Sequence, residues 1–388
     1  MTRHIAQLLL LCVLPLFAAC QEEPHPADSY PEPFSGQVLQ GDSLISPVPQ
    51  RISQRTFEDS TTVVLRQYTV FPDSASSGTP PERMMKMPIA AGLDSREETL
   101  YVMDTESLLI NKYDVASAEL TDVITSAKDA HEPSNYGAGL RMISDEEMWL
   151  YGVKKARITQ MSTTGDLGRD IKFKSGEHHA VSTSGNYVVR RINDDIELFH
   201  TYTSKDKAQA SFGILSSEKI ELNGESFKGH GMGFMGSVIS DGTDSFVYAA
   251  QFGGVLLRYK MDGSLQYFRE AIKPGSFPGL AAYTPSGPNS WSIDDGVSNH
   301  ISYPINEWNG TIYYFVTEKG EDSTRWMIDA YDYDNGDYLY SINRRETCRY
   351  IFITDEHIYA HCIDPGGFVQ FKREGPPEVL PVTDLAEL

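Results

Sequence analysis

A short strand motif that recurs along the chain is the feature that most restricts its fold. Each copy is a polar turn followed by an apolar run that contains an aromatic side chain, and successive copies begin 38 to 66 residues apart. The six copies occupy residues 98–102, 147–151, 185–189, 244–248, 310–314 and 356–360. Repeats of this length built from strands alone indicate a β-propeller, because one four-stranded blade cannot bury both of its faces without neighbours.

A second apolar run follows several copies and ends in a tight turn. These runs occupy residues 109–113, 157–161, 256–259 and 328–331. Two of the turns that follow contain Asp262-Gly263 and Asn335-Gly336, and such steps supply the positive φ that tight hairpins require. The pattern therefore predicts antiparallel hairpins within each repeat.

Six blades of about four strands each account for the length of the chain. We expect the innermost strands at residues 89–93, 140–144, 180–184, 237–241, 301–305 and 350–354. The sixth copy has only three strands before the proline-rich tail at Pro376 and Pro377. The run at residues 62–70 is predicted to supply the missing outer strand, which would close the ring and remove an exposed sheet edge.

This pattern resembles the TolB-like and NHL-like six-bladed β-propellers found in many bacterial lipoproteins, and the resemblance covers about residues 61–382. It implies an all-β fold of six four-stranded blades, with an N-terminal strand closing the last blade. A seven-bladed ring and a solenoid of hairpins are the alternative folds. Propellers serve many purposes, so the resemblance carries fold information and little about function.

The first residues of the chain have the pattern of an export signal. Arg3 and His4 precede an almost wholly apolar stretch at residues 5–19, which is shorter than the roughly 20 residues that a membrane-spanning helix needs. The stretch ends in Phe17-Ala18-Ala19-Cys20, which resembles a bacterial lipobox. The resemblance implies that Cys20 is acylated and begins the mature protein, and that Gln21 after it favours the outer membrane. The alternative is an ordinary secretory signal that ends beside a cysteine.

The region after Cys20 is predicted to be a tether. It carries six prolines among Glu, Ser, Gln and Asp, and no periodic apolar pattern. Such a segment cannot bury enough surface to offset the entropy lost on ordering. We therefore expect a lipoprotein signal peptide at residues 1–19, the acylated cysteine and a disordered tether at 20–60, the propeller at 61–382 and a tail at 383–388.

Only Cys348 and Cys362 remain once Cys12 in the signal and Cys20 are set aside. They flank a hairpin whose turn is expected at Asp355-Glu356, and this turn places residue 348 opposite residue 362 or 363. Cysteines opposite each other on paired strands are close enough to bond, and disulfides persist in exported proteins. We predict a Cys348–Cys362 disulfide, with two buried free thiols as the alternative.

No motif in the chain identifies a reaction. The sequence contains no G-x-S-x-G nucleophile elbow, no H-E-x-x-H zinc motif and no Walker phosphate loop. Acidic residues outnumber basic ones 54 to 33, which gives a net charge of −21. Nucleic-acid binding requires a concentrated basic face, so we expect no nucleic-acid partner.

The fold predicts where a binding site would lie. In a propeller the innermost strands surround a central channel, and the residues that precede these strands surround its mouth. A long connection at residues 273–300 adds aromatic side chains near the same face. The candidate ligand-binding residues are Tyr136, His178, His230, Trp291, His300 and Arg349.

Two functions from different classes remain open. The favoured one is a lipid-anchored cell-envelope protein, at the outer membrane, whose channel face binds a protein, peptide or glycan; it has no catalytic residues and no required cofactor. The alternative is a hydrolase or lyase dependent on calcium or another divalent ion, as the resemblance to lactonase-like propellers implies. Its ligands or general bases would be His178, His230 or His300 with nearby acids.

Overall fold

The structure, a computed structural model, describes most of the predicted propeller and part of the segment before it. The described residues are 38–40, 43–57, 68–71, 88–104, 109–125, 139–152, 157–172, 178–190, 198–215, 220–222, 225–227, 236–251, 253–274, 280–281, 292–293, 300–319, 324–343, 348–363 and 367–373. The expected signal peptide, Cys20 and the C-terminal tail lie outside them. Within these ranges every regular element is a strand, and no helix long and apolar enough to cross a membrane occurs.

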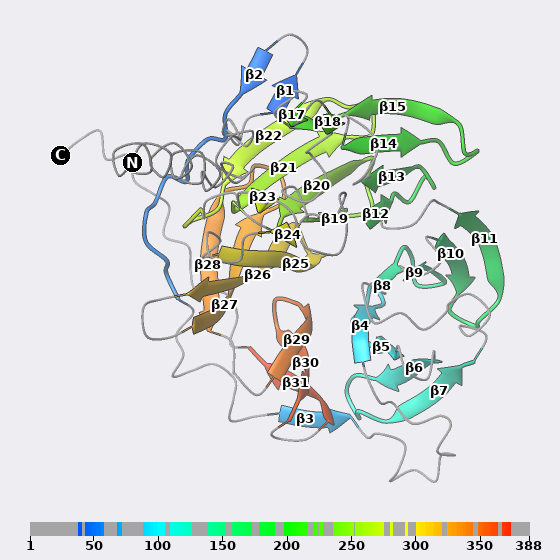
Figure 1. The fold of residues 1–388 in the computed structure, drawn as a ribbon. Helices are drawn as coiled ribbons and strands as arrows, with labels where there is room; N and C mark the ends of the chain where they lie inside the picture. The colour runs from blue at the N-terminus through cyan, green and yellow to red at the C-terminus, as the bar shows by residue number, and fades with distance from the viewer. Residues whose placement is uncertain are drawn as a thin grey trace, which may run out of the picture.

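Six four-stranded antiparallel sheets stand around a central axis, so the predicted all-β, six-bladed propeller is confirmed (Figure 1). The strands of the first three blades follow the chain from the innermost to the outermost. Blade 1 comprises β4 (Pro88–Leu93), β5 (Thr99–Asp104), β6 (Leu109–Asp114) and β7 (Leu120–Ile124). Blade 2 comprises β8 (Gly139–Met142), β9 (Glu147–Gly152), β10 (Arg157–Ser162) and β11 (Leu167–Lys172). Blade 3 comprises β12 (His178–Val181), β13 (Tyr187–Arg190), β14 (Phe199–Tyr202) and β15 (Ala208–Phe212).

In blades 4 and 5 the strands also follow the chain from the innermost to the outermost, whereas the outermost strand of blade 6 comes from the N-terminal part of the chain. Blade 4 comprises β19 (Gly236–Ile239), β20 (Ser245–Ala250), β21 (Val255–Lys260) and β22 (Leu265–Glu270). Blade 5 comprises β25 (His300–Trp308), β26 (Thr311–Lys319), β27 (Thr324–Asp332) and β28 (Tyr338–Asn343). Blade 6 comprises β29 (Cys348–Ile353), β30 (His357–Cys362), β31 (Gly367–Lys372) and β3 (Tyr68–Phe71).

The ring closes as the sequence predicts. β3, from the N-terminal part of the chain, is the outermost strand of blade 6 and pairs antiparallel with β31, with Tyr68 opposite Phe371 and Phe71 opposite Phe368. The innermost strands β29 and β4 of the last and first blades are in contact. One sheet is therefore shared by the two ends of the propeller, which leaves no blade edge at the junction.

Six hydrophobic clusters hold neighbouring blades together, one at each blade boundary. The second strand of a blade supplies side chains to the clusters on both sides, because successive side chains of a strand point to opposite faces. In β26, Tyr313 packs toward blade 6 and Tyr314 toward blade 4. The recurring sequence motif is this second strand, and burial on both faces explains why it is apolar throughout.

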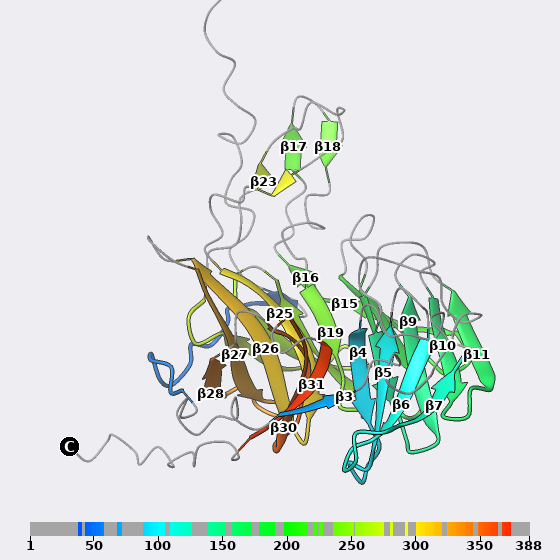
Figure 2. The ribbon, with the colours of Figure 1, turned by 90° about the horizontal axis from the view of Figure 1, so that it is seen from below.

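Tight hairpin turns at one end of the ring connect the first strand to the second in each blade, and the third to the fourth in blades 1 to 5. The expected glycine turns are among them, with φ of 91° at Gly263 and 72° at Gly336. We call this end the tight-turn face. The longer connections between blades lie at the opposite end, where Figure 2 shows the small hairpin β17 (Ile220–Leu222) and β18 (Glu225–Phe227) and the strand β23 (Leu280–Ala281) standing off the ring. β23 pairs with β24 (Ser292–Ile293).

Residues 46–57 lie along the outer strands of blades 4 and 5, and we call this segment the N-terminal strap. Val48 forms a parallel bridge with β22, and Phe57 forms one with β28. The amide of Gln50 donates hydrogen bonds to backbone carbonyls in both blades. Just before the strap, β1 (Val38–Gln40) pairs with β2 (Ser43–Ile45) and with β16 (Ile214–Leu215), which follows blade 3.

A buried ion pair fastens the strap to blade 5. Nε and Nη2 of Arg55 each donate a 2.8 Å hydrogen bond to the carboxylate of Asp329. The two side chains are 4% and 0% exposed. Ser341 donates a further hydrogen bond of 2.6 Å to the same carboxylate.

The strap differs from the expected tether over residues 46–57. The sequence argument considered only whether the segment could bury its own apolar side chains. Edge strands of a sheet offer unpaired backbone groups, and the strap pairs with them through its backbone and polar side chains. A segment without apolar periodicity is therefore ordered by a surface formed from residues more than 200 positions later.

A disulfide joins Cys348 of β29 to Cys362 of β30, which stand opposite each other in the register. The turn between the two strands includes Asp355 and Glu356, as the sequence analysis expects. The bond ties together the first two strands of the blade that closes the ring.

Candidate functional site

A central channel of about 580 Å³ runs along the axis of the ring and is lined by residues from the innermost strands of all six blades. Much of its wall is apolar, and the residues Leu93, Leu140, Met142, Ile239 and Phe352 contribute to it. Its charged lining residues are Arg141, Asp241, Glu307 and Arg349. A cavity of this size, with apolar walls and a few charged groups, has the character of a small-molecule or peptide site.

Of the candidate residues from the sequence, the described ones fall at the end of the channel where the innermost strands begin. Arg349, the second residue of β29, is exposed and lines the channel. His178 and His300 are the first residues of β12 and β25, and only their backbones are described. Tyr136, His230 and Trp291 lie outside the described residues. The role assigned to these residues stays a prediction.

Three charged residues meet at the other end of the channel, where the innermost strands finish. Arg141 comes from β8 in blade 2, and Glu307 from β25 in blade 5, which stands opposite blade 2 in a ring of six. An Nη2 atom of Arg141 lies 3.7 Å from Oε2 of Glu307. Asp241 follows β19 in blade 4 and lines the same channel. The charges therefore face one another across the channel.

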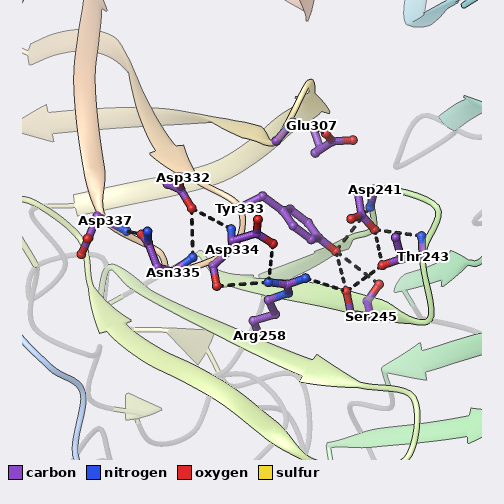
Figure 3. Close-up of polar contacts among 11 residues, drawn as sticks. Asp241, Thr243, Ser245, Arg258, Glu307, Asp332, Tyr333, Asp334, Asn335 and Asp337 are labelled. Atoms are coloured by element: carbon purple, nitrogen blue, oxygen red, sulfur yellow. Dashed lines mark hydrogen bonds and ion pairs between the residues drawn. The ribbon is translucent and has the colours of Figure 1, made fainter. Parts of the chain in front are cut away.

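Asp241 is held in place by its own turn and by blade 5 (Figure 3). Its Oδ1 accepts hydrogen bonds from the backbone and the hydroxyl of Thr243, at 2.8 and 2.6 Å. Its backbone N–H donates to the Tyr333 hydroxyl at 3.3 Å. No contact is drawn from Glu307 to this network (Figure 3). The Asp241 carboxylate is therefore oriented, and one of its oxygens is still without a hydrogen-bond donor among the described residues.

Arg258 of blade 4 packs against Tyr333, the residue of blade 5 that accepts the hydrogen bond from the Asp241 backbone. It thereby connects blades 4 and 5. Its guanidinium lies over the Tyr333 ring at 4.6 Å and donates a 2.7 Å hydrogen bond to Asp334 in the turn of blade 5. A second donor reaches Ser245 at 3.3 Å. Burial raises the pKa of Tyr333 to about 12, so its hydroxyl remains protonated and able to donate at neutral pH.

The electrostatics of Glu307 are unfavourable for its charged form. Burial raises the pKa of Glu307 above its usual value, and the nearby carboxylate of Asp241 raises it further. The Arg141 guanidinium and the backbone N–H of Gly310 act in the opposite direction without reversing the shift. Two carboxylates thus lie in the same cavity as one guanidinium, and the walls of this cavity are partly apolar.

Some polar atoms near the channel have no hydrogen-bond partner in the described part of the chain. They include the buried Nε of Arg141 and the buried indole nitrogen of Trp308, another lining residue. Asn306, by contrast, is fully used in packing, since its side chain bonds the backbone N–H and carbonyl of Ile353 in blade 6. The unused capacity is concentrated on Arg141, Glu307, Asp241 and Trp308.

The turns between first and second strands surround this end of the channel with acidic side chains. Across residues 94–98, 143–147, 182–186, 240–244, 307–310 and 354–356 the only basic residue is Arg96. The acidic residues in these turns are Asp94, Glu97, Glu98, Asp145, Glu146, Glu147, Asp241, Asp244, Glu307, Asp355 and Glu356. Burial, then the charges of Glu356, Asp355 and Asp94, raise the pKa of Glu97. The mouth of the channel is therefore strongly negative.

No group of three or more His, Cys, Asp and Glu side chains comes together as a metal site within the described ranges. The histidines proposed for a divalent ion are not among the side chains that the structure describes. The metal-dependent alternative therefore stays an expectation from the resemblance.

Sequence reasoning did not select Arg141, Asp241 or Glu307 as site residues. Two of them fall within or at the end of the predicted innermost strands, and Glu307 lies two residues beyond one. The sequence does offer one signal for these site residues, namely a charged side chain in or next to a strand that is expected to line the channel. This signal is weak in a chain with 54 acidic residues, and the connections before these strands carry more histidine and aromatic side chains.

Comparison with known proteins supports the fold. No family model matches the chain, and no curated protein matches it. A member of the duf4221 family from Bacteroides vulgatus is 9% identical, with a TM-score of 0.51 over 80% of this chain and 96% of that one. A protein described as exported, from Bacteroides fragilis, is 10% identical with a TM-score of 0.48, over 84% and 98% of the two chains. A streptogramin B lyase is 11% identical with a TM-score of 0.43, over 79% and 98%. At such identities the first likeness shows the fold alone, and the other two carry no argument.

Proposed function

We propose that this protein is an exported, lipid-anchored β-propeller of the cell envelope that binds a protein, peptide or glycan partner through its central channel. The observation that carries the proposal is the set of Arg141, Asp241 and Glu307, which come from three different blades and meet in one cavity. Part of their hydrogen-bonding capacity, namely Nε of Arg141, Oε2 of Glu307 and Oδ2 of Asp241, is not used by the described part of the protein. Buried polar groups are normally satisfied, so a bound partner would complete them.

Attachment to a membrane rests on the sequence around Cys20. The proposed anchor precedes β1 by 17 residues, at positions 21–37, and not by the forty expected for a tether up to residue 60. Even fully extended, 17 residues reach at most about 60 Å. The propeller would therefore work close to the membrane surface, at the outer membrane if the lipobox resemblance holds.

Replacing the proposed lipid site tests the anchor. We expect Cys20→Ser to move the full-length protein from the membrane fraction to the soluble fraction of its native cells and to abolish incorporation of an alkyne-labelled fatty acid. A Cys12→Ser variant is the matched control, because Cys12 lies within the signal, and it should change neither. Fatty-acid labelling that survives Cys20→Ser would overturn lipid attachment at this residue.

Site-specific crosslinking tests the channel as the binding site. A photoreactive p-benzoylphenylalanine would replace Met142 at the tight-turn end or Arg349 at the other end, and Leu167 on the outer strand β11 would serve as the control. We expect adducts of defined mass from one or both channel positions in intact cells, and none from position 167. Equal labelling at all three positions, or none at the channel positions, would contradict the proposed function.

A further inference from the structure

Two ion pairs in this molecule have contrasting geometry. The Arg55–Asp329 pair in the strap is bidentate, with two hydrogen bonds of 2.8 Å. The Arg141–Glu307 pair in the channel is separated by 3.7 Å and makes no hydrogen bond. Buried pairs stabilise a protein only when their geometry and hydrogen bonding are good. The first pair meets that requirement, and the second does not, although its side chains are only 21% and 11% exposed.

The channel groups leave both donors and acceptors unfilled. On the donor side, the Nε of Arg141 has no partner among the described residues. On the acceptor side, Glu307 receives one hydrogen bond, from Gly310 to Oε1, and the bonds to Asp241 reach only its Oδ1. Oε2 of Glu307 and Oδ2 of Asp241 are the unfilled acceptors. A ligand that completes this site must therefore accept from the guanidinium and donate to the carboxylates.

The inference rests on the channel site of the proposed function but names a smaller ligand than a protein, peptide or glycan: we propose that the channel recognises a zwitterion, namely the adjacent ammonium and carboxylate of an α-amino acid. The ligand carboxylate accepts from Arg141 of blade 2, and the ligand ammonium donates to Glu307 and Asp241 of blades 5 and 4. Binding requires the two side chains, now 3.7 Å apart, to separate, so that each charge gains a hydrogen-bonded partner of opposite sign.

The site holds one positive and two negative groups, and unfilled hydrogen-bonding capacity on both signs favours a zwitterion over a ligand with one charge. An anion would meet two carboxylates, and a cation would meet the guanidinium and leave its Nε unfilled. A neutral sugar could fill the hydrogen bonds but would not compensate the separated charges. The apolar wall formed by Leu140, Met142 and Ile239 further favours an amino acid with an apolar side chain. The negative rim of the tight-turn face would attract the ammonium end first.

The inference is tested by calorimetric titration of the purified full-length protein with four probes. L-leucine carries both charges, N-acetyl-L-leucine lacks the ammonium, L-leucinamide lacks the carboxylate, and glucose is a neutral polyol. We expect L-leucine to bind at least tenfold more tightly than each of the other three. Equal affinity for the three leucine compounds, no binding of L-leucine, or tighter binding of glucose would each overturn the zwitterion.

Variants then assign the charges. Arg141→Gln should weaken L-leucine binding at least tenfold, and Glu307→Gln should do the same. Arg141→Lys keeps the charge but lacks the Nε donor, so it should bind with intermediate affinity. Arg169→Gln is the matched control, because Arg169 also belongs to blade 2 but pairs with Asp206 away from the channel lining. Unchanged binding in folded Arg141→Gln, checked by its melting temperature, would contradict the assignment.

The two proposals fail separately. Specific crosslinks from Met142 or Arg349 together with no L-leucine binding would leave the channel as the binding site and reject the amino-acid ligand. Absence of both results would reject the proposed function itself.

Discussion

At the scale of single residues, two arginine–aspartate ion pairs of this protein should differ in their contribution to stability because their surroundings differ. Arg55–Asp329 and Arg157–Asp170 have nearly equal contact distances, 2.8 and 2.9 Å. The first is almost fully buried, whereas the second is 17% and 29% exposed on blade 2. Water screens the second pair and would solvate either member if the other were removed. Burial, and not distance, therefore decides how much each pair matters.

We expect Arg55→Ala to lower the free energy of unfolding by about 3–5 kcal/mol, because Asp329 would be left as an uncompensated buried charge. Arg157→Ala, the matched control, should cost at most about 1 kcal/mol. Urea denaturation of the two variants beside the wild type measures both values. Equal losses would show that the strap contact contributes no more than a surface pair.

Glu307 should make stability depend on pH. Its pKa is raised in the folded protein above the usual 4.5, so the folded state holds the proton at pH values where the unfolded state has released it. Its contribution to stability is present below pH 4.5 and is lost as pH rises through the folded pKa. Glu307→Gln should remove this loss. The free energy of unfolding of the variant, measured by denaturation, should therefore rise relative to that of the wild type between pH 4.5 and 7.5.

His357 provides a comparison of opposite sign. Burial lowers the pKa of this histidine below 6.5. The folded state then binds fewer protons than the unfolded state at low pH. The free energy of unfolding is therefore reduced at low pH and rises as the pH approaches 6.5. His357→Gln should flatten the pH profile in that range and leave the Glu307 effect in place. Identical profiles for the two variants would mean that neither residue is the source.

At the scale of elements, the outer strands of the blades are not treated alike. β22 and β28 pair with the strap, and β31 is covered by β3. In the described residues, β3, β7, β11 and β15 are also outermost strands of their sheets. Exposed edges invite pairing with other chains, and charged side chains protect them. β11 carries Arg169, Asp170 and Lys172, whereas β15 has no charge. By pairing with β22 and β28, the strap protects the outer edges of these two strands from pairing with other chains.

Two N-terminal truncations should separate residues 38–57, which contain the strap, from the residues before them. A chain that begins at residue 38 keeps every contact described above and should melt within a few degrees of the full-length protein. A chain that begins at residue 58 loses the ion pair and both edge contacts. It should melt at a clearly lower temperature and associate with increasing concentration in light scattering. Equal melting of both truncations would show that residues 46–57 act as a tether after all.

At the scale of the whole molecule, the hydrophobic core is a ring of six clusters and not one central core. An open row of repeats has two ends from which it can unfold stepwise. This ring has no such end, because blade 6 packs on blade 1 and its outer strand comes from the start of the chain. Loss of any blade would expose two clusters at once.

We therefore expect one unfolding transition for the propeller. Trp149 reports on the boundary between blades 2 and 3, and Trp326 on that between blades 5 and 6. Tryptophan fluorescence and far-ultraviolet circular dichroism should follow the same urea curve, as a cooperative transition requires. Curves with different midpoints would indicate that part of the ring unfolds independently.

The sequence alone determined the number of blades, their innermost strands and the origin of the closing strand. These features depend on local alternation of apolar and polar residues and on turn residues, which act within a few positions along the chain. The disulfide could also be predicted, since a single hairpin turn sets which residues stand opposite each other. Such short-range rules can be applied to the sequence without knowing the rest of the fold.

Only the tertiary structure decided the strap and the charged channel. Arg55 meets Asp329 across 274 positions, and Arg141 meets Glu307 only because blades 2 and 5 face each other in a closed ring. In a chain with 54 acidic residues, nothing local distinguishes Asp241 or Glu307 from an acid on a solvated turn. What distinguishes them is burial in the channel and the distance to one guanidinium, and both are properties of the closed ring.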